Sequence, residues 1–177
     1  MFNAAQGNNL AIQLCYYRGA IEFDASPWLT RAEDLLTHMA AVECAPGATQ
    51  IDRLLKHYLR AGSAATPVRA LIFIGDALEE DPAPLRDLAA QCRIKGQPLF
   101  IFQEGDDQRV AEVFKQLATL SGGVYARFDT RSADRLRELL GSVARFASGG
   151  RKALTQSGRD SDKLLLSQLP QSDSCQD

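Results

Sequence analysis

The chemistry that this sequence could perform centres on the acidic segment after residues 70–74. Residues 70–74 (ALIFI) are all apolar, Gly75-Asp76 follow them directly, and residues 78–81 (LEED) continue the acidic character. Carboxylate oxygens are preferred ligands of hard divalent cations, so Asp76 is a candidate metal ligand, binding directly or through water. The alternative is that Asp76 only turns the chain or caps the next helix.

Thr49 is a second candidate, at the end of a Gly-Ala-Thr turn that precedes an amphipathic helix. A hydroxyl at that position ordinarily caps the backbone of the helix, and this is the alternative to any role in binding. Two further loops, residues 103–106 (QEGD) and Asp129, follow other segments that we expect to be strands. Ligands of open α/β sheets bind at the carboxyl ends of the strands, so the loops at 75–76, 103–106 and 129 are the candidate sites.

Motifs of common enzyme classes are absent from the sequence. It contains no Walker lysine loop and no GxSxG segment. The two histidines, His38 and His57, follow no expected strand, so we expect surface side chains and no general base. The four cysteines form no CxxC pair, which disfavours a metal-thiolate site and a disulfide framework. With reduced thiols and no recognisable secretory signal, a cytoplasmic location is expected.

Length and charge exclude two classes of partner. The chain has 177 residues with 20 basic and 22 acidic side chains, a formal net charge of −2. A protein that binds nucleic acid by neutralising phosphates needs a basic excess. No apolar run approaches the ~20 residues that span a bilayer. We therefore expect one compact domain with neither a nucleic-acid nor a membrane partner.

The first half of the sequence predicts a hairpin and two helices. Residues 10–17 and 20–23 are rich in β-prone side chains and flank Arg18-Gly19, which predicts a tight antiparallel hairpin. Ser26-Pro27 then begins a predicted helix. The apolar stripe expected on this helix consists of Trp28, Leu29, Ala32, Leu35, Leu36 and Met39. A second helix is predicted to bury Ile51, Leu54, Leu55, Tyr58 and Leu59.

The second half alternates apolar strands with helices. Residues 70–74, 99–102 and 124–128 are predicted strands with helical segments between them, and the last helix is expected to stop at Gly149-Gly150. This alternation predicts an α/β, Rossmann-like fold with a mostly parallel sheet, one antiparallel hairpin at its edge, and helices on both faces. Residues 149–177 are polar, so we expect a folded domain over 1–148 and a mobile, disordered tail, with a short docking helix at LLL (164–166) as the alternative.

With these features placed, residues 8–148 resemble a von Willebrand factor A (VWA) domain, and more narrowly a group of small bacterial VWA proteins. The resemblance rests on LAIQLCYYRG/AIEF, PGATQI, ALIFIGDALEED, PLFIFQEG, GGVYARF and SGGRKAL. It implies a metal-ion-dependent adhesion site, in which an Asp-x-Ser-x-Ser loop, a threonine and an aspartate hold Mg²⁺. The threonine corresponds to Thr49 and the aspartate to Asp76.

The sequence departs from the family at the Asp-x-Ser-x-Ser loop. Its nearest approximation, DASPW at residues 24–28, lies after the hairpin, whereas the family's loop follows a central first strand. We therefore expect an N-terminally shortened domain in which that strand is missing. Residues 10–17 and 70–74 should then be separated by a gap or pulled together. Mg²⁺ binding should be weak, because two side chains cannot complete an octahedral site.

The function that the resemblance implies is non-enzymatic protein binding. A cation at Thr49 and Asp76 would leave one position for a carboxylate of the partner protein. The alternative is a metal-independent interaction domain that uses its helix faces, its tail or a sheet edge. A third hypothesis is a phosphoacceptor or hydrolase with Asp76 as nucleophile, although the acidic residues that a receiver-like site needs after the first strand are not visible.

Overall fold

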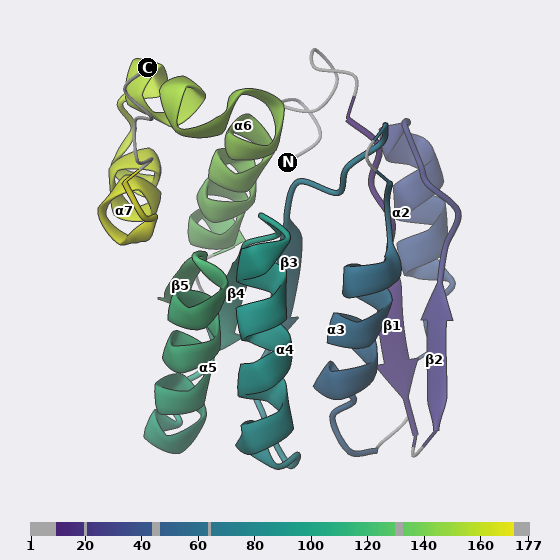
Figure 1. Ribbon diagram of the computed structural model, residues 1–177. Coiled ribbons are helices and arrows are strands. Elements are labelled where there is room, and N and C mark those ends of the chain that lie inside the picture. Colours follow the sequence, from purple (N-terminus) through teal and green to yellow (C-terminus); the bar gives the residue numbers. More distant parts are fainter. Residues whose placement is uncertain (1–9, 20, 44–46, 64, 130–132, 172–177) are drawn as a thin grey trace.

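The computed structural model describes residues 10–19, 21–43, 47–63, 65–129 and 133–171 (Figure 1). Its elements in chain order are β1 (Cys15–Arg18), β2 (Glu22–Ala25), α2 (Ala32–Ala40), α3 (Ile51–Arg60), β3 (Leu71–Gly75), α4 (Pro82–Ile94), β4 (Leu99–Glu104), α5 (Gln108–Ser121), β5 (Val124–Phe128), α6 (Ala133–Ser157) and α7 (Asp160–Gln168).

Strands β3, β4 and β5 form a parallel sheet in that order. Phe100 in β4 lies opposite both Ile72 of β3 and Val124 of β5. The central strand β4 is buried from Leu99 to Gln103, as expected for a parallel strand with both faces covered. The sheet and the helices on its two faces give an α/β fold consistent with the predicted Rossmann-like arrangement.

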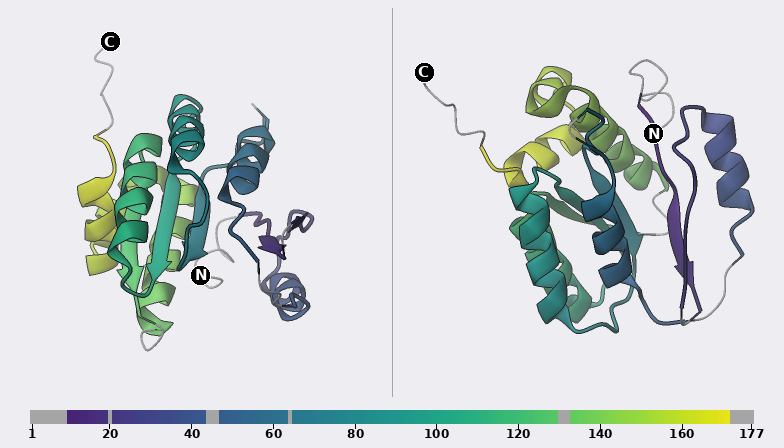
Figure 2. Two further views of the ribbon diagram at one scale, coloured as in Figure 1. Left: turned by 90° about the horizontal axis from the view of Figure 1, so that it is seen from below. Right: turned by 45° about the vertical axis from the view of Figure 1, so that its right-hand side comes forward.

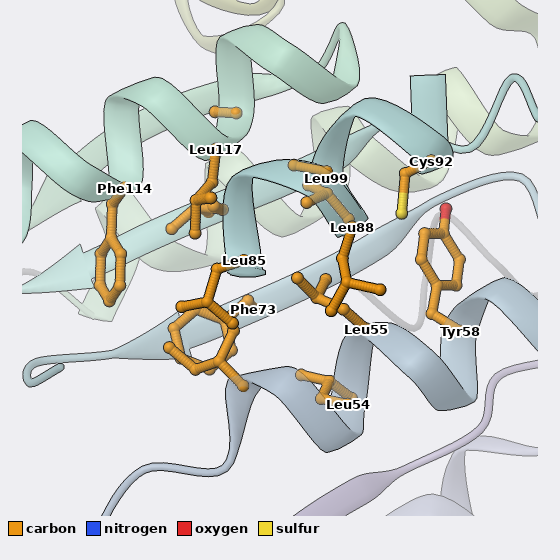
Figure 3. Packing of buried hydrophobic residues seen from close by; sticks show 14 of the residues in the cluster. Leu54, Leu55, Tyr58, Phe73, Leu85, Leu88, Cys92, Leu99, Phe114 and Leu117 are labelled. Carbon is orange, nitrogen blue, oxygen red and sulfur yellow. The ribbon is translucent and has the colours of Figure 1, made fainter. Parts of the chain in front are cut away.

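Each face of the parallel sheet has its own core. The first core lies against helices α3, α4 and α5, and Figure 3 shows part of it, including Tyr58, Phe73, Cys92 and Phe114. The second core lies against α6 and α7 and includes Phe100, Phe102, Leu139, Leu154 and Leu165. Because successive side chains of a strand point to opposite faces, the apolar strands supply both cores.

The hairpin β1–β2 forms a separate antiparallel sheet. It lies on the β3 side of the parallel sheet, in the order β5-β4-β3 and then β1-β2 (Figures 1 and 2). The predicted hairpin is confirmed. Of the two arrangements expected for residues 10–17 and 70–74, separated or pulled together, the structure has the strands unpaired and in different sheets. The predicted single sheet with the hairpin at its edge is wrong for the described residues, because no ladder joins β1 to β3.

Helix α3 attaches the hairpin to the rest of the molecule. The ring of His57 lies 5.5 Å from the ring of Phe23, and its Nε2 lies 2.8 Å from Oε1 of Gln13. The guanidinium of Arg53 lies 5.9 Å from the centre of the Phe23 ring. Cys15 and Tyr17 of β1 pack against the first core, which includes the buried face of α3. His57 is therefore half-buried and contacts the hairpin.

The first predicted elements begin at other residues than expected. Gly19 has a φ of +58°, and the turn that it makes shifts the second strand from 20–23 to β2. Residues 26–29 are extended and pair with residues 12–14, so helix α2 begins six residues after Ser26, at Ala32. Because the helix begins later than predicted, the predicted apolar stripe does not form one buried face. Only Leu29 and Leu35 among its large members are buried. The other large members are exposed: Trp28 by 46%, Leu36 by 57% and Met39 by 51%.

The predicted disordered tail is wrong for residues 149–171. Gly149 and Gly150 break the helical backbone as expected, but α6 resumes beyond them and α7 follows. Leu154 and Leu165 are fully buried in the second core. The short docking helix considered as an alternative corresponds to α7, and residues 172–177 lie outside the described part of the chain. No helix within the described residues has the length and apolar character to cross a membrane.

Candidate functional site

Thr49 lies against the loop that carries Asp76. The backbone N–H of Glu79 donates to Oγ1 of Thr49 over 3.2 Å, and the N–H of Thr49 donates to a carboxylate oxygen of Glu79 over 2.9 Å. This reciprocal pair joins two segments that are 30 residues apart in sequence. Asp76 is exposed, three residues before Glu79 in the same loop. The structure therefore places both predicted site residues at the end of the molecule where β3 finishes.

The next residue, Glu80, caps helix α3. Its carboxylate accepts hydrogen bonds from the N–H groups of Ile51 and Asp52, over 2.6 and 2.9 Å. A carboxylate at a helix N-terminus accepts hydrogen bonds from the backbone N–H groups that have no partner within the helix. Its negative charge also interacts favourably with the positive end of the helix dipole. Gln50 occupies the cap position but makes no side-chain cap bond. The interpretation of Thr49 as the cap of this helix is therefore wrong.

Asp76 does not cap the helix that follows it. The N-cap of α4 is Asp81, which accepts a hydrogen bond from the N–H of Ala83 over 3.0 Å, and Pro82 occupies the first turn. Pro has no N–H to satisfy and is well suited to that position. Asp76 is therefore not the cap of helix α4.

The turn of the hairpin reaches the same end of the molecule. A Cβ placed on Gly47 would lie 2.0 Å from the carbonyl oxygen of Gly19, so only glycine allows these two backbones to meet. Nε2 of Gln50 also donates to the carbonyl of Gly19, over 3.4 Å. The residues just before Thr49 are therefore held against the end of β1.

Tyr17, at this end of β1, experiences the charge of the acidic loop. Burial, and after it the carboxylates of Glu80, Glu79 and Asp76, raise the pKa of Tyr17 to about 12. Its hydroxyl therefore stays protonated and remains a hydrogen-bond donor at neutral pH. We call Tyr17, Thr49, Asp76, Glu79 and Glu80 together the acidic rim.

Glu79 remains ionised well into the acid range. Hydrogen bonds from the backbone and the side chain of Thr49 lower the pKa of Glu79 below its ordinary value. The charge of Glu79 therefore strengthens its hydrogen bond from the N–H of Thr49 at neutral pH, and this contribution is lost as the pH falls through the lowered pKa of the carboxyl.

The residues of the rim do not by themselves fit a Mg²⁺ ion. Mg²⁺ takes six oxygen ligands in octahedral geometry, whereas Thr49 and Asp76 supply two. Across the described part of the chain, no group of three or more His, Cys, Asp or Glu side chains is arranged to hold a metal. Asp24 and Ser26, the nearest match to the family's loop, bond to Tyr16 and to the backbone of Leu14 within the hairpin region.

The loop after β4 is occupied by structural contacts. Gln103 is fully buried; its amide oxygen accepts from the hydroxyl of Tyr125 over 2.6 Å and its amide nitrogen donates to the carbonyl of Asp107 over 2.9 Å. Asp107 caps α5, and Arg127 donates to the carbonyl of Gly105. Thr49 bonds to Glu79, which lies three residues beyond Asp76 and so just outside the predicted loop 75–76.

Sequence reasoning missed Tyr17 and the capping role of Glu80. Tyr17 lay inside a predicted strand and gave no signal of its own. Glu80 belongs to the acidic segment 78–81, which the sequence analysis treated only as a group of acidic residues. Its capping role was missed because the helix that it caps begins 29 residues earlier in the chain. Comparisons with family models, with curated proteins and with solved structures each found no match to this chain.

Proposed function

We propose that this chain is a non-enzymatic protein-binding module of VWA type, acting in the cytoplasm, and that it contacts its partner through the acidic rim. The observation that carries the proposal is the reciprocal hydrogen bonding of Thr49 and Glu79. It holds a hydroxyl oxygen beside an exposed carboxylate loop, an arrangement suited to contact with another protein. Asp76 and Glu79 are the exposed carboxylates of residues 76–80; Glu79 bonds to Thr49, and Asp76 caps neither α3 nor α4.

In this proposal, Mg²⁺ binds only when further ligands are supplied from outside the described residues. Thr49 and Asp76 offer two oxygen ligands, so a stable Mg²⁺ site needs the partner, or chain beyond the described residues, to supply the others. We expect calorimetry on the isolated chain to show no micromolar Mg²⁺ binding. Micromolar binding would contradict the view that the ligand set is incomplete.

The test is affinity capture of partner proteins with the full chain. Asp76→Ala should lose the proteins that the wild type retains in Mg²⁺, whereas Asp87→Ala should retain them. Asp87 is a matched control because it is an exposed aspartate on helix α4, outside the rim. Circular dichroism should show that both variants are folded. Equal retention by Asp76→Ala and wild type would exclude the rim as the contact surface.

A second candidate is binding without any metal. It is favoured by the incomplete ligand set of the described residues and by the hydroxyl of Thr49, which already accepts a protein hydrogen bond. The same capture experiment separates the two candidates. Retention that survives EDTA supports the metal-independent module, and retention that EDTA abolishes supports the metal-dependent one.

A further inference from the structure

We propose that helix α7 is a strap that keeps the chain monomeric: its Gln168 closes the open edge of β5, and release of α7 lets β5 pair with β5 of a second copy. In Figures 1 and 2, α7 lies outside β5, on the side of the parallel sheet away from the hairpin. This device is separate from the acidic rim and does not rest on the proposed function.

Strand β5 is the end strand of the parallel sheet and pairs with β4 on one side. Backbone N–H and C=O groups alternate in direction along a strand. Those of Val124 and Ala126 point toward β4, and those of Tyr125 point away from it, to the open edge. An end strand with unpaired backbone groups is a template for pairing with another chain.

Gln168 occupies this edge with both ends of its side-chain amide. Its Oε1 accepts from the backbone N–H of Tyr125 over 3.0 Å, and its Nε2 donates to the carbonyl of Tyr125 over 2.9 Å. A side-chain amide carries the same kinds of donor and acceptor as a peptide group. A residue directly opposite Tyr125 in an antiparallel strand would make the same two bonds. Gln168 therefore stands where a neighbouring strand would pair.

Contacts at both ends of α7 hold Gln168 in this place. Near the start of the helix, the carboxylate of Asp162 accepts from the guanidinium of Arg145, the shortest contact being 2.7 Å. Just after its end, Arg151 donates to the carbonyls of the next two residues, over 2.9 and 3.1 Å. Leu165, between these two anchors, is fully buried in the second core. The edge therefore stays closed for as long as α7 is docked.

The joint between α6 and α7 allows the strap to move as a unit. Gly158 connects the two helices with a φ of +63°, a conformation that favours glycine. A Cβ placed on Gly158 would meet no other part of the described chain within 4 Å. Rotation about this residue can therefore displace α7 without a clash at the joint.

The edge that α7 covers is complementary to itself. Two β5 strands related by a twofold axis run antiparallel, and Tyr125 then lies opposite Tyr125 of the second copy. This pair makes the same two backbone bonds that Gln168 makes in the monomer. In the same register Arg127 lies opposite Gly123 of the second copy, so that like charges do not face each other. A second copy is therefore the occupant that the exposed edge fits.

The first test measures amide exchange in dilute solution. Gln168→Ala should speed exchange of the Tyr125 amide by about tenfold or more, because this N–H loses its acceptor. The Ala126 amide, which points toward β4, should stay slow and shows that the variant is folded. Gln156→Ala is the matched control, since Gln156 is an exposed glutamine of α6 outside these contacts. Equal exchange of the Tyr125 amide in wild type and Gln168→Ala would overturn the closure of the edge by Gln168.

The second test measures self-association by analytical ultracentrifugation over a concentration series. The release variant, Asp162→Asn with Gln168→Ala, should form a dimer with a dissociation constant at least about tenfold below that of wild type. Gln168→Ala alone, with its ion pair intact, should shift in the same direction, and Gln156→Ala should behave like wild type. If neither variant associates more tightly than wild type, the strap does not control assembly and the proposal fails.

A third pair of variants shows whether the dimer forms through β5. Arg127→Pro, added to the release variant, removes an N–H that points away from β4, where an edge strand tolerates proline, and should abolish the dimer. Arg127→Ala also removes the bond from the side chain to the carbonyl of Gly105 but keeps this N–H, so the dimer should persist. A dimer that survives Arg127→Pro would place the contact elsewhere and overturn pairing through β5.

Discussion

At the scale of single residues, backbone contacts that only glycine permits hold the fold together. Gly123 leads into β5, and a Cβ there would lie 1.9 Å from the carbonyl oxygen of Leu99 at the start of β4. Gly47 meets Gly19 in the same way at the acidic rim. Both contacts join segments that are distant in sequence, so each residue matters beyond its own turn.

Replacing Gly123 tests this close approach. Gly123→Ala should lower the free energy of unfolding by about 3 kcal/mol, because the backbone of β4 or β5 must shift to admit the methyl group. Gly141→Ala is the control, since its Cβ would lie no nearer than 3.4 Å to Arg145 and alanine favours a helix interior. Urea denaturation measures both variants. Equal stability of the two would show that the contact at Gly123 relaxes without cost.

At the scale of elements, helix α7 is fixed by a buried ion pair. The carboxylate of Asp162 is fully buried and accepts hydrogen bonds from Arg145 of α6, the shortest over 2.7 Å. Ser142 donates to Ser161 beside this pair, over 2.9 Å. Burial alone would raise the pKa of Asp162, but hydrogen bonds from Arg145, Ser142 and Ser157 outweigh it and lower that pKa. The polar residues of α7 are thus part of its docking contact.

Asp162→Asn should lower the free energy of unfolding by about 3 kcal/mol at pH 7, because it leaves the charge of Arg145 without its partner. The pKa of Asp162 is lowered in the folded chain, so its contribution is complete above the ordinary value of 3.8 and is lost as the pH falls through the lower folded value. The difference between wild type and variant should therefore shrink below about pH 4.

Asp160→Asn is the control for this prediction, since that side chain is 93% exposed in its pair with Lys163. Its unfolding free energy should stay within about 0.5 kcal/mol of wild type. Urea titrations at pH 7 and pH 3.5 measure all three proteins. A constant difference between wild type and Asp162→Asn at both pH values would show that ionisation of Asp162 does not stabilise the fold.

Sequence-based prediction succeeded where the signal lies in neighbouring residues and failed where it depends on contacts between distant segments. The apolar strands and the Gly149-Gly150 break were predicted because continuous apolar runs and paired glycines act locally. Docking of α7 was not predicted as the leading interpretation, because no local pattern pairs Asp162 with Arg145. At the acidic rim, the loop of Asp76 was found from its place after a strand. The role of Glu80 depends on a helix 29 residues away and was not predictable.

At the scale of the whole molecule, two sheets share one helix. Helix α3 contributes Leu54 and Leu55 to the first core, and its exposed side holds the hairpin through Arg53 and His57. The hairpin and the parallel sheet have no ladder between them in the described residues. Their connection therefore depends on side chains and on the contact between Gly19 and Gly47.

This arrangement predicts two levels of stability. Native-state hydrogen exchange should show amides of β1 and β2 opening at a free energy about 2 kcal/mol or more below that of β4, because the hairpin can detach without unfolding the parallel sheet. The control is the dependence on denaturant, which should be weak for the hairpin amides and steep for those of β4. Identical opening free energies for both sheets would show that the molecule unfolds as one unit.

The positions of two thiols have a consequence for chemical labelling. Cys15 belongs to the hairpin and Cys92 to the first core. Burial is the main cause that raises the pKa of each thiol to about 11. Alkylating reagents attack the thiolate, which is scarce at neutral pH for both residues while the native contacts persist. Iodoacetamide therefore modifies Cys15 and Cys92 slowly while these contacts persist and faster as they open, so one thiol reports on the hairpin and the other on the first core.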